Sequence, residues 1–342
     1  MTIKFFMETE KYLTYKSWPK IELHVHLDCS LHFDVIRKYR PEVTRDVYNQ
    51  EYVAPDRCLD LPDLFRSVNN SIELMQTPEQ LRASIEYLFR QFQKDGVIYA
   101  EIRFAPHLHT ERGLSPSRVV EIAESAVEEQ VSKTGIEAGL LLCTLRQYSE
   151  KMSMETVQLV YEFRNSFVAG FDIAGDEAAY PIDEHKKAFQ FAIEKGIPRT
   201  AHAGEAAGPE SVLETLNHFQ PTRIGHGVRS VDSPEVIEIL VEKNIHLEVC
   251  PSCNIQIGLF ERYDNHPVNK LKMSGVSTGI NTDGRTTTNI TLGSEYEKLS
   301  TAFGWTKPDF FQVNMNALEA AFVSDSKKDH LKRQLNDYYD CE

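Results

Sequence analysis

From residue 77 to residue 305, the chain alternates short apolar runs that favour strands with longer amphipathic segments that favour helices. Each of the longer segments opens with a helix start signal. This alternation is typical of repeated βα units, in which every strand is followed by a helix that returns the chain to the start of the next strand. The pattern therefore predicts an α/β fold built on a parallel sheet.

The clearest predicted helix begins after Thr77, which is placed to cap it. Pro78 takes the first helical position, Gln80 stands three residues after the cap, and apolar residues then recur on one face until Gly96. Three further amphipathic segments start in the same way, at Ser115-Pro116, Gly208-Pro209 and Ser233-Pro234.

Eight short runs have the composition of strands, and seven of them carry a His, Asp, Glu or Arg near the carboxyl end. In a (β/α)8 TIM barrel these ends converge on one face, which is where such enzymes hold their active sites. We predict a single barrel domain over residues 1–342, with the barrel core at about 18–305 and a helical C-terminal tail at 306–342. The predicted strands are 21–27, 99–105, 139–145, 169–175, 198–204, 223–228, 245–251 and 276–283.

The segment between the first two predicted strands, residues 29–97, is longer than one βα unit requires. We expect it to form extra helices over the C-terminal mouth of the barrel. Leu61, Leu64 and Phe65 are the candidate lid residues of this segment.

Charge excludes several classes of partner. The 342 residues include 37 Lys and Arg against 51 Asp and Glu, a formal net charge of −14. Such a chain is repelled by phosphate backbones and anionic lipids, so we expect no nucleic acid and no membrane partner. We also predict no protein partner. The first residues lack the apolar run of a signal peptide, and the six cysteines are too few for a disulfide framework, so we expect a cytoplasmic protein with reduced thiols.

The strongest chemical signal is the pair His24 and His26 in the first predicted strand. Side chains two positions apart on a strand point to the same side, so both imidazoles can share one metal ion. Asp28 points to that side as well if the strand continues. The alternative is a chance His-x-His pair with one imidazole packed in the core.

Three further signals follow later predicted strands. His202 and Glu205 follow the fifth, His226 lies between two glycines after the sixth, and Asp283 follows the eighth. Each has an ordinary structural explanation. Glu205 could complement a helix dipole, His226 could be a packing residue, and Asp283 could be a turn or cap residue. In a single barrel, all of these residues lie at the same mouth. Their gathering there makes the separate structural explanations less convincing.

Three imidazoles and one carboxylate form a donor set that suits zinc and leaves room for water. Zinc lowers the pKa of a bound water to about 7. A protonated glutamic acid can then donate a proton to the substrate while a second base orients the water. The residues therefore predict a metal-assisted hydrolytic attack on an electron-poor carbon.

Five motifs follow one another along the chain: PKIELHVHLD (19–28), HAGE (202–205), RIGHGV (223–228), EVCPSCN (248–254) and STGINTDGRTTTN (277–289). In this order they resemble the motifs of the adenosine deaminase family of zinc amidohydrolases. The resemblance implies that one zinc ion per chain is bound by His24, His26, His202 and Asp283.

The same resemblance implies the catalytic roles. Glu205 protonates the purine nitrogen N1 as water adds at C6. His226 positions this water and helps to deprotonate it, with the assistance of Asp283. Ammonia leaves, and adenosine, or 2′-deoxyadenosine, becomes inosine or its deoxy form.

Substrate contacts are implied at three residues. Asp28 matches the family's ligand of a ribose hydroxyl, Gly175 matches the glycine whose N–H meets the purine N3, and His26 belongs to the same subsite. For Gly175 a plain strand-to-helix turn is the alternative. Relatives that act on adenine tend to have Glu at the position of Asp28, and methyl-AMP deaminases tend to have Asn, so Asp28 favours a nucleoside.

Three residues depart from the family pattern. Cys29 stands where Gly is usual, which places a thiol beside the ribose subsite. Gly284 replaces an Asp that contacts N7 in many members. Cys253 replaces a Ser and forms a Cys250-x-x-Cys253 pair, which we interpret as part of a buried turn and not as a second metal site.

Two alternatives to an adenosine deaminase stay open on sequence alone. One is a deaminase of a related aminopurine, namely adenine, N6-methyl-AMP or aminodeoxyfutalosine. The other is a binding protein that keeps the barrel without catalysis.

Overall fold

The structure of the protein is a computed structural model that describes residues 15–59 and 61–339, apart from the side chains of residues 61 and 62. In these residues, eight parallel strands form two groups of four, and within each group a strand pairs with the next one in the sequence. Backbone bridges join Val25 to Asp283 and Phe171 to Arg199, so the two groups contact each other at both edges. The strands are β1 (Lys20–His26), β2 (Val97–Phe104), β3 (Glu137–Leu145), β4 (Val168–Ala174), β5 (Thr200–Ala203), β6 (Arg223–His226), β7 (His246–Val249) and β8 (Ser277–Ile280).

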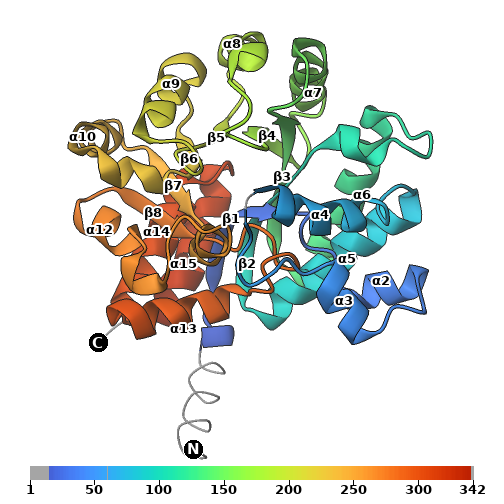
Figure 1. The fold of residues 1–342 in the computed structure, drawn as a ribbon, viewed down its shortest axis with the longest axis horizontal. Coiled ribbons are helices and arrows are strands. Elements are labelled where there is room, and N and C mark those ends of the chain that lie inside the picture. Colours follow the sequence, from blue (N-terminus) through green and yellow to red (C-terminus); the bar gives the residue numbers. More distant parts are fainter. Residues whose placement is uncertain (1–14, 60, 340–342) are drawn as a thin grey trace, which may run out of the picture.

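All eight predicted strands are confirmed, and with them the (β/α)8 TIM barrel. Helices surround the strands, as Figure 1 shows. They are α2 (Phe33–Tyr39), α3 (Arg45–Glu51), α4 (Leu61–Ile72), α5 (Pro78–Lys94), α6 (Pro116–Thr134), α7 (Glu150–Glu162), α8 (Lys186–Glu194), α9 (Pro209–Phe219), α10 (Pro234–Glu242), α11 (Pro251–Gln256), α12 (Val268–Met273), α13 (Leu292–Phe303), α14 (Lys307–Ala320) and α15 (Asp325–Tyr339), with short 3₁₀ helices η1 (Pro106–His109), η2 (Asp183–His185), η3 (Val228–Asp232) and η4 (Tyr263–Asn265).

The four predicted helix starts are confirmed, three of them with a side-chain cap. The side chain of Thr77 accepts a hydrogen bond from the backbone N–H of Gln80, and Ser115 and Ser233 cap α6 and α10 in the same way. Helix α9 starts at Pro209, as predicted, without a side-chain cap. Each cap satisfies one of the N–H groups that the first helical turn leaves free.

The long segment after β1 forms the extra helices that the sequence predicts. Helices α2, α3, α4 and α5 lie between β1 and β2 in the sequence, and α4 lies near the centre of the view in Figure 1. Leu64 and Phe65 of α4 line the cavity at the barrel mouth. The third candidate lid side chain, that of Leu61, lies outside the described residues.

The inside of the barrel holds buried ion pairs, whereas the sequence predicts mainly apolar strands. Arg103 on β2 lies 2.7 Å from Asp172 on β4 and 2.6 Å from Glu248 on β7. Arg223 on β6 pairs with Glu248 at 2.7 Å and with Glu101 on β2. All five side chains are fully buried, and buried charges of this kind persist only when they are paired and hydrogen-bonded.

The tail helices α14 and α15 pack against the start of the barrel. The side chain of Asn314 accepts a hydrogen bond from the N–H of Ile21 at 2.8 Å, and the hydroxyl of Tyr339 donates to the carbonyl of Pro19 at 3.2 Å. The tail forms helices as far as Tyr339, while its assignment with the barrel to one domain of 342 residues stays a prediction.

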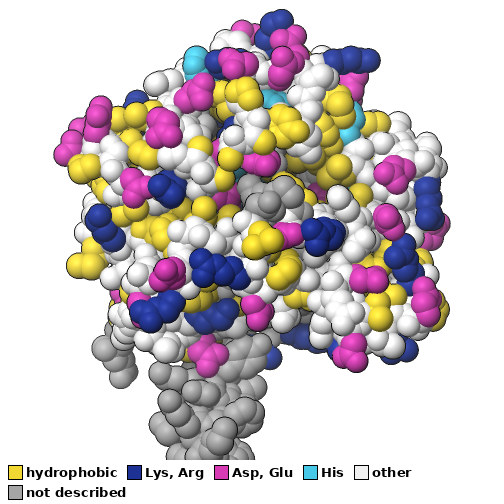
Figure 2. Space-filling view, viewed as in Figure 1, with side chains coloured by type: hydrophobic (Ala, Val, Ile, Leu, Met, Phe, Trp, Pro, Cys, Tyr) yellow, Lys and Arg dark blue, Asp and Glu magenta, His cyan; other side chains and the backbone are white. Residues whose placement is uncertain are grey.

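Two surface properties bear on partners. On the face drawn in Figure 2, Asp and Glu side chains are interspersed with Lys and Arg side chains. None of the described helices combines the length and the apolar composition that crossing a bilayer requires.

Candidate metal and catalytic site

A cavity of about 280 Å³ opens at the carboxyl ends of the strands. Its walls bring together nearly all the site residues that the sequence predicts, from the ends of five different strands and the turns after them. Helix α4 adds apolar side chains to the wall. The predicted residues that line the cavity are His26, Asp28, Gly175, His202, Glu205, His226 and Asp283, while His24 is fully buried beside it.

Four side chains bring one donor atom each to a common point. Donor atoms of His24, His26, His202 and Asp283 all lie within 4.8 Å of one another. The Nε2 atom of His26 lies 3.2 Å from Nε2 of His202 and 3.3 Å from Oδ1 of Asp283, and Nε2 of His24 lies 3.4 Å from that same oxygen. This is the set that the sequence predicts as metal ligands.

Hydrogen bonds on the far side of two rings show how this point is suited to a cation. The Nδ1 atom of His24 lies 2.9 Å from Glu248, and that of His202 lies 3.3 Å from Asp172. Because a carboxylate only accepts, each ring carries its proton on Nδ1 and turns an unprotonated Nε2 inward. The Nε2 atom of His24 is buried and has no hydrogen-bond partner. An unpartnered lone pair among other acceptors fits a bound divalent cation.

Charges and burial keep these groups in the forms that bind metals. Burial lowers the pKa of His26 and of His202, so both rings are neutral at neutral pH. Although burial alone would raise the pKa of Asp283, its contacts with the rings of His24 and His26 hold it well below its usual range. The site therefore offers neutral nitrogens and one ionised carboxylate.

The supporting carboxylates were not predicted from the sequence. Asp172 and Glu248 each orient one imidazole, and Arg103 bonds to both of them. Burial raises the pKa of each carboxyl group, but the charges around them outweigh this effect and hold both pKa values below the usual range. Their only signal in the sequence is a charged residue inside a predicted buried strand.

The backbone around the four-donor cluster has features that make room for the imidazole rings. A Cβ atom on Gly225 would lie 3.0 Å from Cε1 of His24 and 3.2 Å from Cγ of His202, so a larger residue would crowd both imidazoles. His226 and Asp283 have φ values of 61° and 62°, a left-handed conformation that side chains rarely adopt. Such strained residues gather at functional sites.

Beside the four-donor cluster, Glu205 and His226 face one another. Oε1 of Glu205 lies 3.4 Å from Nδ1 of His226, and the side-chain amide of Asn254 lies 3.1 Å from that nitrogen. Burial, followed by the negative charges of Asp283 and Glu177, raises the pKa of Glu205 well above its usual value. Burial lowers the pKa of His226. A protonated carboxyl group and a neutral imidazole thus share one wall, as general acid–base chemistry requires.

The loop that carries Glu205 is held by a buried carboxylate. Glu177 accepts hydrogen bonds from the backbone N–H groups of Gly204, Glu205 and Ala207, at 2.7, 2.9 and 2.9 Å. Glu177 was not predicted as a site residue, although it stands only two positions after Gly175, the last residue of a predicted strand. It fixes the position of Glu205 and adds a negative charge near it.

Two predicted substrate-binding residues also lie on the cavity wall. Strand β1 ends at His26, so Asp28 reaches the wall from the turn after the strand and not from the strand itself. Gly175 has a φ of 104°, and a Cβ atom there would lie 2.9 Å from the side chain of Gln147. The position therefore requires glycine, and its role toward a substrate stays a prediction.

Cys29 packs so closely against Gly284 that residue 284 has no room for a side chain. A Cβ atom on Gly284 would lie 2.7 Å from Cβ of Cys29 and 2.1 Å from Oγ1 of Thr287. The Cys29 side chain lines the cavity, and burial raises the pKa of its thiol well above the usual value. Between Asp28 and Asp283 the wall thus carries a neutral thiol, and it has no room for a side chain at residue 284.

This packing predicts a stability effect. We expect Gly284→Ala to lower the free energy of unfolding by about 1–3 kcal/mol, the usual cost of overpacking. The double variant Cys29→Gly/Gly284→Ala should recover part of that loss, because it removes one of the two clashes. Urea unfolding of both variants and of Cys29→Gly alone measures the effect. A Gly284→Ala variant as stable as the parent would contradict the packing.

The pair Cys250 and Cys253 is buried, and neither thiol forms a disulfide. Donor atoms of His24, His226 and Cys250 also lie within 4.8 Å of one another. However, the Cys250 thiol donates to the carbonyl of Glu248, and burial raises its pKa. A protonated thiol is a poor metal ligand, so the cluster of three histidines and Asp283 is the better site.

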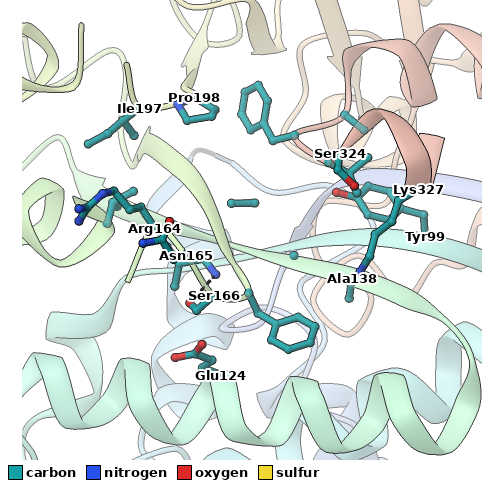
Figure 3. A pocket seen from close by; sticks show the side chains of 18 of the residues that line it. Tyr99, Glu124, Ala138, Arg164, Asn165, Ser166, Ile197, Pro198, Ser324 and Lys327 are labelled. Carbon is teal, nitrogen blue, oxygen red and sulfur yellow. Dashed lines mark hydrogen bonds between the residues drawn. The ribbon is translucent and has the colours of Figure 1, made fainter. Parts of the chain in front are cut away.

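A larger cavity, of about 940 Å³, lies at the amino ends of the strands. Figure 3 shows Glu124 on α6 and Arg164, Asn165 and Ser166 before β4 facing this space, with Lys327 on the far side. Neither of the two donor clusters found in the described part of the chain lies here. The donor residues thus lie at the smaller cavity, at the opposite end of the barrel.

Comparison with known proteins places this geometry in a family. The family model described as "Adenosine deaminase" matches residues 19–338. The chain is 34% identical over 333 residues to an adenosine deaminase of Clostridium acetobutylicum, a match that covers 93% of this chain and 97% of the relative. It is 34% identical over 331 residues to an adenosine deaminase of Haemophilus ducreyi, covering 93% and 96%.

Solved structures share the fold. An adenine deaminase of Arthrobacter aurescens matches with a TM-score of 0.86 and 22% identity, over 94% of this chain and 99% of that one. An amidohydrolase of Burkhoderia ambifaria with bound Zn matches with a TM-score of 0.87 and 22% identity, over 96% and 92%. An N6-mAMP deaminase of Arabidopsis matches with a TM-score of 0.84 and 24% identity, over 95% and 99%.

Proposed function

This chain belongs to the adenosine deaminase family, and from that premise we propose that it holds one zinc ion and hydrolyses adenosine to inosine and ammonia. The observation that carries the proposal is the convergence of four donor atoms next to a buried, protonated Glu205. In the reaction, water forms a bond to C6 of the purine, and the bond from C6 to the amino nitrogen breaks.

His24, His26, His202 and Asp283 would hold the zinc ion. The donor set suits zinc, since imidazole nitrogens and one carboxylate are its common ligands in catalytic sites. When bound, the ion supplies the Lewis acidity that makes a water molecule nucleophilic near neutral pH. The unpartnered Nε2 of His24 and the fixed tautomers of His24 and His202 support this assignment.

Glu205 and His226 handle the protons. The raised pKa of Glu205 keeps it protonated at neutral pH, so it can donate to the purine nitrogen N1 as water adds at C6. His226 is neutral and accepts a proton from the attacking water, and Asp283 lies beside it as a second acceptor. Protonation of N1 makes C6 more electron-poor, which lowers the barrier to attack.

The cavity wall favours a nucleoside without a phosphate group. Asp28 accepts a ribose hydroxyl, the N–H of Gly175 donates to purine N3, and His26 contacts the same subsite. The side chains of α4 on the wall are mainly apolar, as suits a purine ring. The ionisable groups on the wall are acids, histidines and Cys29, with no Lys or Arg among the described lining residues. An AMP-type substrate would bring its phosphate next to these acids without a counter-charge.

Comparing kcat/KM across candidate substrates tests the function. We expect adenosine and 2′-deoxyadenosine to be turned over faster than adenine, N6-methyl-AMP and aminodeoxyfutalosine, as followed by the change in ultraviolet absorbance. A higher kcat/KM for one of the last three would reassign the substrate. A zinc-loaded protein that changes none of them would favour a non-catalytic binding protein.

We also expect Glu177→Gln to slow the enzyme. An amide accepts hydrogen bonds from the three backbone N–H groups less strongly than a carboxylate does, so the loop that carries Glu205 should shift. A displaced Glu205 lowers kcat about tenfold or more. Loss of the Glu177 charge lowers the pKa of Glu205, so the alkaline limb of the kcat profile should move to lower pH. Glu214→Gln, an exposed change on α9, is the matched control. An unchanged pH profile with unchanged kcat would contradict this role.

The proposal includes a cytoplasmic location and a small-molecule partner. Cys29, Cys143, Cys250 and Cys253 carry thiols outside any disulfide, as is usual for proteins of a reducing compartment.

A further inference from the structure

One buried histidine outside the metal cluster contacts a residue of the substrate subsite. His109, at the end of η1, is fully buried. Its Nε2 atom lies 2.8 Å from Oδ1 of Asp28, and its Nδ1 atom lies 3.1 Å from the carbonyl oxygen of Met75. The other oxygen of Asp28 accepts a hydrogen bond from the N–H of Ala105 at 3.3 Å. The sequence alone gives no role to His109.

These contacts hold the Asp28 carboxyl group at both ends. Because one oxygen is bound to the imidazole and the other to a backbone N–H, the group cannot rotate about its last bond without losing a hydrogen bond. Asp28 is 5% exposed and lines the cavity, so what it presents to a substrate is an acceptor of fixed orientation. A preorganised acceptor binds a hydroxyl group more tightly than a mobile one.

His109 is itself anchored to the chain behind helix α4. Met75 lies three residues after the end of α4. The next residue, Gln76, forms hydrogen bonds with η1 and with the loop that follows η1. The Gln76 side chain donates to the carbonyl of Leu108 at 2.8 Å and accepts from the N–H of Glu111 at 3.0 Å. The imidazole of His109 therefore lies between the segment after α4 and the η1 region. Hydrogen bonds join these two segments and hold the ring in place.

We propose that His109 is a positioning residue that holds Asp28 as the acceptor of a sugar hydroxyl, and that it thereby sets the preference for a nucleoside over a free aminopurine. The proposal rests on the proposed function, because it assigns the sugar subsite of that same reaction. His109 does not touch the reacting atoms, so its contribution lies in KM and in substrate preference.

Two variants of His109 test the proposal. Leu removes both ring nitrogens, whereas Gln keeps an amide N–H near the position of Nε2. The assay compares kcat/KM for adenosine with that for 2′-deoxy-, 3′-deoxy- and 5′-deoxyadenosine. His246→Leu, which removes a buried imidazole at the start of β7, is the control, and zinc content and melting temperature are measured for every variant.

We expect His109→Leu to lower kcat/KM for adenosine by about tenfold or more, mainly through KM. The deoxy analogue that lacks the contacted hydroxyl should already be poor with the parent protein and should lose little more. His109→Gln should recover part of the adenosine activity. In an Asp28→Asn background, His109→Leu should have little further effect on adenosine.

Four outcomes would overturn the proposal. They are equal losses for adenosine and all three analogues, a His109→Leu variant with unchanged kcat/KM, a His109→Gln variant as impaired as His109→Leu, and a parent protein that treats all the deoxy analogues like adenosine. Failure of the proposed function looks different, because the parent protein itself would then leave adenosine unchanged.

Discussion

Glu205→Gln should keep its fold and its zinc and lose about 10²- to 10⁴-fold in kcat for adenosine, the range that general acid catalysis contributes. The amide has nearly the same shape as the protonated acid, so the contacts of the loop at residues 204–207 stay in place. It cannot give up a proton to N1. Because the parent group works in its protonated form, parent activity should fall as pH rises through the raised pKa of Glu205. This alkaline limb should disappear in the variant.

Three measurements check this expectation: kcat as a function of pH, zinc content and melting temperature. The control is Glu210→Gln, an exposed change five residues further along the chain. A Glu205→Gln variant with parental kcat would remove the acid from the mechanism. Loss of zinc or of fold in the variant would place Glu205 in the structural support of the site instead.

His202→Ala should lose zinc and, with it, all measurable turnover. The change deletes one of four donors, and it leaves Asp172 without the ring that it orients. Loss of an outer contact alone costs about 10–100-fold in metal affinity, so loss of a ligand should cost more. The remaining donors cannot close around the space that the imidazole fills.

Metal analysis after dialysis, together with an adenosine assay, measures this effect. His246→Ala removes another buried imidazole and should keep full zinc. If His202→Ala retained one zinc ion per chain, the ligand set would be wrong, even if activity were lost. If added zinc restored activity to His202→Ala at the same concentration as in the parent, that would also contradict the assignment.

The sequence was sufficient for the barrel, because its signals are local. The cap at Thr77, the proline at residue 78 and the apolar strand runs each depend on neighbours within a few positions. The order of the strands around the barrel follows from short right-handed connections. Polar residues at strand ends then fall at one mouth, which is why His24 and His202 could be predicted to meet although 178 positions separate them.

The supports of the site could not be predicted in this way. Asp172 and Glu248 look like isolated charges in buried strands until the barrel places Arg103 between them. The contact between His109 and Asp28 spans 81 positions and depends on the path of a loop. The packing of Cys29 against Gly284 likewise depends on two loops that meet only in the folded chain. Pairings of this kind are properties of three-dimensional contact and leave no periodic pattern.

Stepwise addition of zinc to metal-free protein tests the central claim most directly. Adenosine turnover should rise in proportion to added zinc and reach its plateau at one equivalent per chain, the number that the single cluster of His24, His26, His202 and Asp283 can hold. Full turnover by the metal-free protein, or a zinc-loaded protein that leaves adenosine unchanged, would contradict it.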